Sequence, residues 1–277
     1  MTADAGPSAH VRDIVLLLPL YRFDGPPRIE IAEGLAIVEA RDARWPATHA
    51  VRRTLRLPVA PGGGAPRPED AAAYTAARED LWIVMRALHA VALGRCYGER
   101  VVQDAGSASQ HGWRMPVLPS LDGGALDGHA LERPGSVDVI RWCLEEPARR
   151  LLRVPLRRLH SALRRSSDEA RLVDLLSGLE SMLLPHFDAD LALRFAVRGS
   201  SLLGANLDER QQIFLRLRTA SRERDRVLRH EDDAITTPLE ALTDDLRRCI
   251  RICAERMALT HEPLTAYITG LETELML

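Results

Sequence analysis

The N-terminal part of the chain alternates between apolar and polar positions in short runs, which is typical of β-strands. The run Ile14–Leu20 is nearly all apolar, Ile29–Val38 places its apolar residues on odd positions, and Leu55–Val59 alternates again. Two adjacent prolines at 26–27 and a glycine-rich stretch at 61–66 separate these runs. The pattern predicts a small β-rich unit of three strands.

The next stretch changes to a helical period. A helix is expected from Pro68 to Gly94, because acidic residues follow the proline and a glycine stops the pattern. Its apolar stripe recurs at helical spacing, in Leu81, Val84, Leu88 and Val91. Residues 96–135 carry many glycines and prolines, and they predict an irregular connection with one strand at Tyr97–Val102.

From Val137 onward the pattern is helical to the end of the chain. Four helices are expected at 167–184, 188–203, 206–228 and 237–257, and a short fifth one at 263–275. The fourth has the clearest start, with Thr237 as the capping residue and Pro238 in the first helical position. Short connections favour an antiparallel bundle. We therefore predict an α+β protein with an N-terminal α+β domain over residues 1–135 and an all-α helical domain over 136–277.

Charge gives no global attraction to nucleic acid, because the net charge is −2. All 37 basic residues are arginines, and arginine is the better phosphate ligand because its planar group donates two parallel hydrogen bonds. A GC-rich genome would produce the same bias. The helical half is locally rich in arginine, at Arg141, Arg149, Arg150, Arg153, Arg157, Arg158, Arg164 and Arg165.

Several classes of function are disfavoured. The four cysteines are too few and too scattered for a disulfide framework, and Cys249 and Cys253 have no neighbouring ligands for zinc, so buried small side chains are expected. No glycine-rich phosphate loop or HExxH or GxSxG motif occurs. The longest apolar run is too short to cross a bilayer, which predicts a soluble, cytoplasmic protein without a membrane partner. His160, His186 and His261 are isolated, and surface or capping roles are expected for them.

The segment whose residue types best suit catalysis is Arg222–His230, at the end of the third bundle helix. Arg224 and Asp225 are followed by His230 with five residues between the arginine and the histidine. A histidine titrates near neutrality and can move a proton, and an arginine stabilises negative charge that develops on a phosphate. An arginine-rich, solvated helix face would show the same residues without a site.

This segment resembles the arginine-polar-histidine signature of the HEPN ribonucleases, and its surroundings resemble those of ApeA-like HEPN domains. Leu172–Leu184 is similar to the opening helix with its acidic residue, here Glu180. Leu191–Leu203 is similar to the second helix with two spaced arginines, here Arg194 and Arg198, and Leu239–Met257 to the closing helix. The likeness covers the region from about Ala162 to Leu277, and it extends only loosely to the first half.

The resemblance implies a metal-independent endoribonuclease without cofactors, a toxin or antiviral defence effector acting on host or phage RNA. In such an enzyme Arg224 would bind the scissile phosphate and His230 would transfer the proton. Asp225 would orient Arg224 and His230, with Glu180 in a supporting position. Further phosphate contacts would come from Arg194, Arg198, Arg222, Arg226 and Arg229. Six positions along a helix leave Arg224 and His230 about 120° apart around its axis. The family brings such pairs together in a homodimer, which we expect here through the helical domain.

An alternative is a catalytically degenerate HEPN bundle that serves as a dimerisation, RNA-binding or partner-binding module. ApeA-like sequences have serine beside the arginine and glycine after the histidine, whereas this chain has Asp225 and then Glu231–Asp233. Acidic groups beside a phosphate site repel the negatively charged RNA backbone. Glu180 could equally be a carboxylate at the core edge, and Arg194 and Arg198 could pair with Glu180 and Asp174 instead of phosphate. The N-terminal domain would sense a trigger or restrain the nuclease through a regulatory partner.

Overall fold

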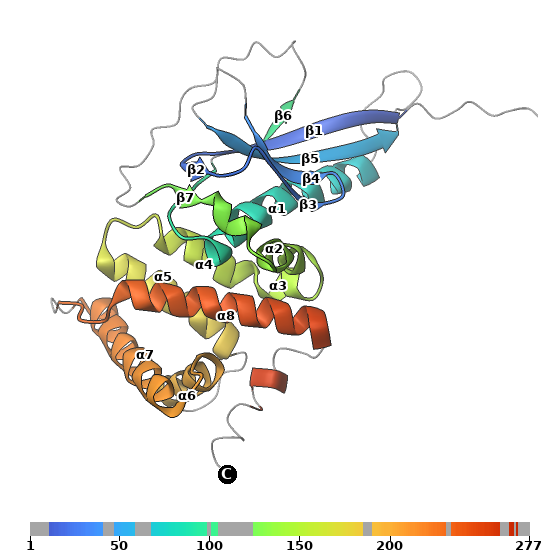
Figure 1. Ribbon diagram of the computed structural model, residues 1–277. Helices are drawn as coiled ribbons and strands as arrows, with labels where there is room; N and C mark the ends of the chain where they lie inside the picture. Colours follow the sequence, from blue (N-terminus) through green and yellow to red (C-terminus); the bar gives the residue numbers. More distant parts are fainter. Residues whose placement is uncertain are drawn as a thin grey trace, which may run out of the picture.

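The computed structural model describes residues 11–40, 47–58, 68–98, 101–104, 124–184, 190–230, 234–260, 266–268 and 270. It confirms the α+β class: an antiparallel sheet is followed by a mostly helical region (Figure 1). The sheet has the order β3-β4-β5-β1-β6, with strands β1 (Val11–Leu20), β3 (Arg28–Ala32), β4 (Leu35–Glu39), β5 (His49–Pro58) and β6 (Val102–Asp104). A separate parallel pair joins β2 (Phe23–Asp24) to β7 (Leu126–Asp127).

The expected single strand over 29–38 is wrong, because the chain turns back there as the β3–β4 hairpin. Gly34 occupies the turn with a φ of +66°, a conformation in which glycine carries no side-chain penalty. Ile31, Leu35 and Ile37 are all buried, so odd positions face the core on both sides of the turn. Because the turn keeps the buried residues on odd positions, the alternation alone could not show that the chain reverses direction there.

Two other strand predictions are displaced. β5 begins at His49 rather than near Leu55, and it pairs along its whole length with β1. The strand expected at 97–102 lies at 102–104, on the other side of β1. Tyr97 instead forms an isolated bridge with Tyr21, and their rings stack with centroids 5.4 Å apart.

The helical region begins with α1 (Pro68–Val91), which contacts β1 and β5 on one side and α2, α4 and α8 on the other. The predicted stripe is buried at Leu81, Val84 and Leu88, but so are residues between its members, including Met85 and Ala87. A helix that is apolar around most of its circumference belongs inside a protein. α1 therefore lies between the sheet and the helices (Figure 1).

Of the remaining helices, the last four follow the predicted boundaries closely, whereas the short ones before Ser167 were not predicted individually, and the first of them lies where an irregular connection was expected. The helices after α1 are η2 (Gly128–Glu132), α2 (Ser136–Leu144), α3 (Ala148–Leu151), α4 (Arg153–Ala162), α5 (Asp168–Leu183), α6 (Leu191–Leu203), α7 (Leu207–Leu228) and α8 (Leu239–Thr260). Ser167 caps α5 by accepting the Ala170 amide at 3.2 Å, and Asn206 caps α7 by accepting the Glu209 amide at 2.9 Å. The fifth predicted helix, 263–275, falls mainly outside the described residues.

Thr237 does not cap α8 with its side chain, contrary to expectation. The helix begins at Leu239, and the buried Thr237 hydroxyl has no hydrogen-bond partner among the described residues. The Thr237 amide donates instead to a carboxylate of α7, at Glu223. A hydrogen bond to another helix thus takes the place of the predicted side-chain cap.

One cluster of buried apolar side chains runs from the sheet, at Leu16 and Val51, through α1 to the bundle formed by α5–α8, at Leu246 and Cys253. The cysteines are free and buried, as expected, and burial raises the pKa of the Cys143 thiol to about 12. None of the described helices combines the length and apolar character that crossing a bilayer requires.

His160 does not lie on the surface, contrary to expectation. Its Nδ1 is 3.1 Å from Nε2 of His89 on α1, and both rings are buried. Burial lowers the pKa of His160 to about 3 and that of His89 well below 6.5, with smaller contributions from neighbouring positive charges. Both imidazoles are therefore neutral in the folded protein at neutral pH.

This pair predicts a loss of stability in mild acid. Since the unfolded chain binds a proton at each histidine below about pH 6.5 and folded His160 does so only near pH 3, the contribution of His160 is complete above pH 6.5 and falls as pH decreases toward 3; the lowered pKa of His89 acts in the same direction. Each histidine contributes a slope of about 1.4 kcal/mol per pH unit inside this window. Urea unfolding from pH 7 to 4 measures it. His160→Gln should remove about half of the slope, whereas the exposed control His129→Gln should leave it unchanged. An equal slope in both variants would contradict the assignment.

Candidate functional site

Arg224 lies on α7 and faces α5. Its Nη1 is 2.5 Å from Oε1 of Glu180, and its Nη2 is 3.4 Å from Oδ1 of the adjacent Asp225. The Arg224 side chain is 20% exposed and that of Glu180 is 27% exposed, so the pair is partly shielded from water. The predicted arginine and the predicted supporting acid are therefore brought together by helices that are far apart in sequence.

The surroundings keep Arg224 charged. Burial lowers the pKa of this guanidinium, but hydrogen bonding and attraction from Glu180, with a smaller contribution from Asp225, outweigh burial and raise it overall. Its Nε is buried and has no hydrogen-bond partner in the part of the chain that the structure describes. The group is thus a fixed cation, oriented from one side by Glu180.

His230 lies beyond the end of α7, not on it. The helix ends at Leu228, and His230 adopts a φ of +59° while its amide donates to the Val227 carbonyl at 3.1 Å. Its side chain is exposed, as is that of Asp225. The expected separation of about 120° assumed a continuous helix, and it does not apply because the backbone turns into the left-handed region.

The predicted phosphate-binding arginines fall into different environments. Arg222 and Arg229 are exposed near the end of α7, and Arg194 and Arg226 are half-buried. Arg198 is only 3% exposed and donates to the Leu183 carbonyl at 2.8 Å, so it stabilises the connection between α5 and α6 from inside the protein.

The carboxylates considered as partners of Arg194 and Arg198 are held by other arginines. Asp174 accepts from Arg158 and from Arg165, each at 2.7 Å, and Glu180 is paired with Arg224. Asp174 is 1% exposed, and a buried carboxylate requires such compensation. These contacts attach α4 to α5.

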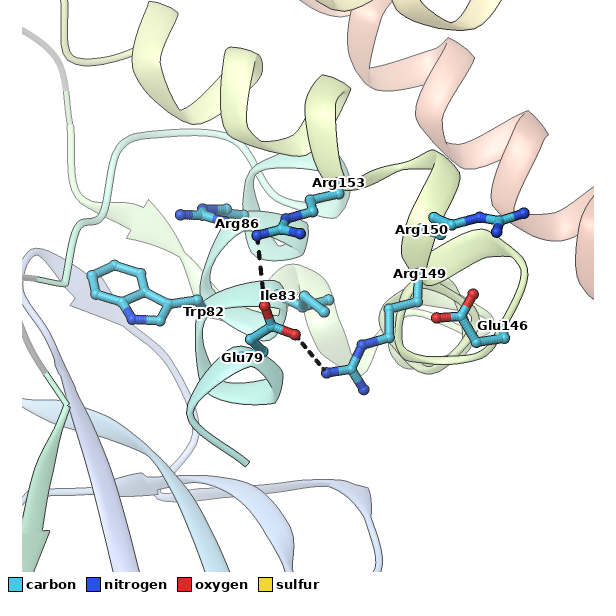
Figure 2. Close-up of a pocket in the computed structure, with 8 residues that line it drawn as sticks. All are labelled: Glu79, Trp82, Ile83, Arg86, Glu146, Arg149, Arg150 and Arg153. Atoms are coloured by element: carbon cyan, nitrogen blue, oxygen red, sulfur yellow. Dashed lines mark hydrogen bonds and ion pairs between the residues drawn. The ribbon is translucent and has the colours of Figure 1, made fainter. Parts of the chain in front are cut away.

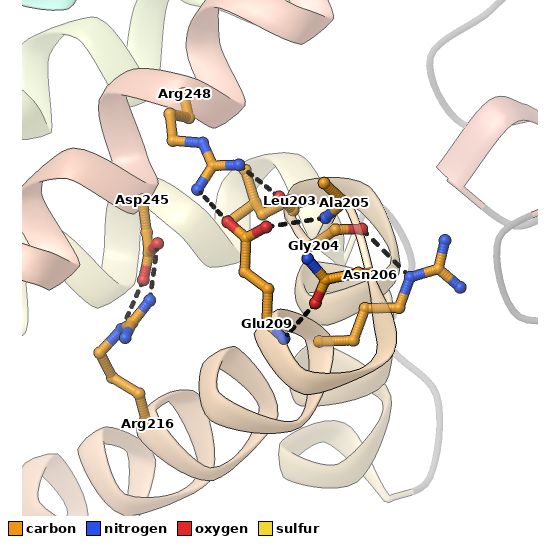
Figure 3. A network of polar contacts seen from close by, with 9 residues as sticks. Leu203, Gly204, Ala205, Asn206, Glu209, Arg216, Asp245 and Arg248 are labelled. Atoms are coloured by element: carbon orange, nitrogen blue, oxygen red, sulfur yellow. Dashed lines mark hydrogen bonds and ion pairs between the residues drawn. The ribbon is translucent and has the colours of Figure 1, made fainter.

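A second set of polar contacts holds α6, α7 and α8 together (Figure 3). Arg216 binds Asp245 through two hydrogen bonds of 2.8 and 2.9 Å, and Arg248 donates to Glu209 at 2.9 Å. The other oxygen of Glu209 accepts the Ala205 amide at 3.0 Å. These bonds fix the angle of α7 against α8 and thereby the position of its C-terminal end.

Glu223 was not predicted as an important residue. It is 2% exposed and accepts hydrogen bonds from the Thr236 amide at 2.8 Å, the Thr236 hydroxyl at 2.5 Å and the Thr237 amide at 3.1 Å. Burial raises the pKa of this carboxyl, but these hydrogen bonds more than compensate and lower it overall. No local pattern marks Glu223, because it lies among charged residues and its partners come from the start of α8.

Within the described ranges, no group of three or more histidine, cysteine, aspartate or glutamate side chains is placed to hold a metal ion. The absence of a metal or cofactor stays a prediction. Comparisons with protein-family models, with curated proteins and with solved structures found no match to this chain. The arrangement at the end of α7 thus stands on its geometry: an oriented arginine, an exposed acid and an exposed histidine.

The Glu223 contacts predict that removing Glu223 lowers the free energy of unfolding much more than removing the nearby Asp225. Glu223→Ala leaves two amides before α8 without their acceptor and should lower the free energy of unfolding by about 2–3 kcal/mol. Asp225→Ala removes an exposed carboxylate two positions away and should cost less than about 0.5 kcal/mol. Urea denaturation at pH 7 compares them, and equal losses would show that Glu223 has no special role.

Proposed function

We propose that the chain is a HEPN-type endoribonuclease that needs no metal, with Arg224 and His230 as its catalytic residues. The observation that carries the proposal is the 2.5 Å contact between Arg224 and Glu180, which orients a cation at the end of α7, where an exposed histidine follows. The order of helices, with an acid on α5 and the arginine on α7, agrees with the resemblance.

The chemistry requires a proton acceptor, a stabilising cation and a proton donor. The neutral imidazole of His230 removes the proton of a ribose 2′-hydroxyl, and the oxygen attacks the adjacent phosphorus. Arg224 stabilises the negative charge that develops on the phosphorane oxygens. The bond to the 5′-oxygen then breaks and that oxygen takes up a proton, which leaves a cyclic 2′,3′-phosphate and a free 5′-hydroxyl.

A two-fold homodimer would supply the second proton-transfer group. One His230 can serve as the base while its symmetry mate serves as the acid. The exposed side chain of Leu228 on α7, at 61%, gives apolar surface close to His230 on which two copies could meet. The substrate would be host or phage RNA, and residues 1–135 would sense a trigger or bind a regulatory partner.

A second candidate is a non-catalytic HEPN-like module that binds RNA or a partner protein. The specific observation in its favour is that two carboxylates, Glu180 and Asp225, oppose the charge of Arg224. The acidic Glu231–Asp233 follows His230 in the sequence. Such a module would keep its fold and its self-association without cleaving RNA.

Cleavage of a fluorescent RNA in EDTA tests the first candidate. His230→Ala should reduce the rate by roughly 10²–10⁴-fold, because a placed proton-transfer group contributes that much. His129→Ala, which also removes an exposed imidazole, is the matched control and should leave the rate unchanged. Both variants should unfold at the same temperature as the parent, since neither side chain is buried. If the parent protein and His230→Ala are equally active or equally inactive, the nuclease proposal fails and the binding module remains.

A further inference from the structure

A cavity of about 290 Å³ lies away from α7, between α1 and the chain segment from Glu146 to Arg153 (Figure 2). Its α1 wall consists of residues spaced three, four and seven apart, which form one stripe on a helix. The stripe comprises Glu79, Trp82, Ile83 and Arg86. Because the other sides of α1 are buried against the sheet and bundle, this stripe is held in a fixed orientation toward the cavity.

The opposite wall is mainly basic. Arg149 and Arg150 come from α3 and Arg153 from the first position of α4, with Glu146 just before α3. The residues that line the cavity carry a formal surplus of two positive charges. A concave, partly apolar wall that carries several arginines suits a small anionic ligand.

The internal acid holds these cations only weakly. Figure 2 shows the Glu79 carboxylate between Arg149 and Arg153, at distances of 3.4 and 3.6 Å. Strong charge-assisted hydrogen bonds measure about 2.7–2.9 Å. Arg149 also forms an ion pair with Asp80, in which its Nη1 lies 2.8 Å from Oδ1. Glu79 is therefore a replaceable occupant of the space between the two guanidinium groups.

Arg86 adds a positive charge that Glu79 compensates only in part. Its guanidinium lies 5.5 Å from the centre of the Trp82 ring, and its buried Nε has no hydrogen-bond partner among the described residues. Burial lowers the pKa of Arg86, and the positive charges of Arg157 and Arg153 lower it further, with only partial opposition from Glu79. An anion in the cavity would relieve this repulsion.

We propose that this cavity binds a mononucleotide, with the phosphate between Arg86 and Arg153 and the base along Trp82. A phosphate ester offers a doubly charged group with three acceptor oxygens, which suits two neighbouring guanidinium groups better than a carboxylate does. The volume is at the lower end of the roughly 300–1,000 Å³ typical of ligand pockets, and it exceeds what an ordered water needs. A mononucleotide fits both the size and the combination of charge with an aromatic wall. The inference does not rest on ribonuclease activity.

Calorimetric titration of the full chain with AMP, ribose 5-phosphate and adenosine tests the parts of this assignment. AMP should bind most tightly, ribose 5-phosphate more weakly because it lacks the base, and adenosine not measurably because it lacks the phosphate. Equal binding of AMP and ribose 5-phosphate would overturn the role of Trp82. Binding of adenosine as tight as that of AMP, or no binding of either phosphate ester, would overturn the site.

Two variants should shift the affinity for AMP in opposite directions. Arg153→Ala removes an exposed cation and should weaken binding by about tenfold or more. Glu79→Gln removes the internal competitor and should tighten binding, which general damage to the fold cannot produce. Arg56→Ala, on an exposed position of β5, is the matched control and should leave the dissociation constant unchanged. If Glu79→Gln weakens binding, or if Arg56→Ala weakens it as much as Arg153→Ala, the proposal is wrong.

Discussion

The structure depends on the burial of the second half of α1. Leu81, Val84, Met85 and Leu88 are fully buried, and the smaller Ala87 lets a neighbouring element approach closely. A fully buried leucine or methionine contributes about 1.5–3 kcal/mol by leaving water, so this helix joins the sheet to the bundle more strongly than any surface contact could. Two polar features of α1, the neutral His89 and the stripe along the cavity, are fixed in place by that burial. Both would lose their geometry if α1 shifted.

Arginine pairs supply the specificity that the apolar core lacks. Asp174 and Asp245 are buried carboxylates on different helices, and each is bound by an arginine from another element. A pair of this kind is weak evidence for stability, because desolvation offsets most of the attraction. It does penalise alternative packings, since any shift along a helix would leave a buried charge without a partner. Leucine and alanine thus form much of the apolar core, and the arginine pairs fix how the helices align with one another.

The contact between Arg224 and Glu180 belongs to this series, but it differs from the others in exposure. Asp174 and Asp245 have side chains that are 2% and 3% exposed, whereas Glu180 is 27% exposed and lies where α7 ends. A purely structural pair does not need this position, and a site needs contact with solvent. The same contact that orients Arg224 also reduces its net charge, which is why the catalytic and the binding proposals both start from it.

Hydrophobic spacing and helix-capping signals were sufficient to predict the α+β class and the helices α1 and α5 to α8, because periodicity and capping depend on residues a few positions apart. They failed at Gly34, where a turn preserved the parity of the strand pattern, and at Thr237, where Glu223 replaced the local cap. Glu180 was grouped with Arg224 and His230 only through the family resemblance. Only the tertiary structure decided that Glu180 pairs with Arg224, that His89 meets His160, and that one stripe of α1 faces the arginines of α3 and α4. Such contacts join side chains far apart in the sequence, and no local pattern encodes the packing that brings them together.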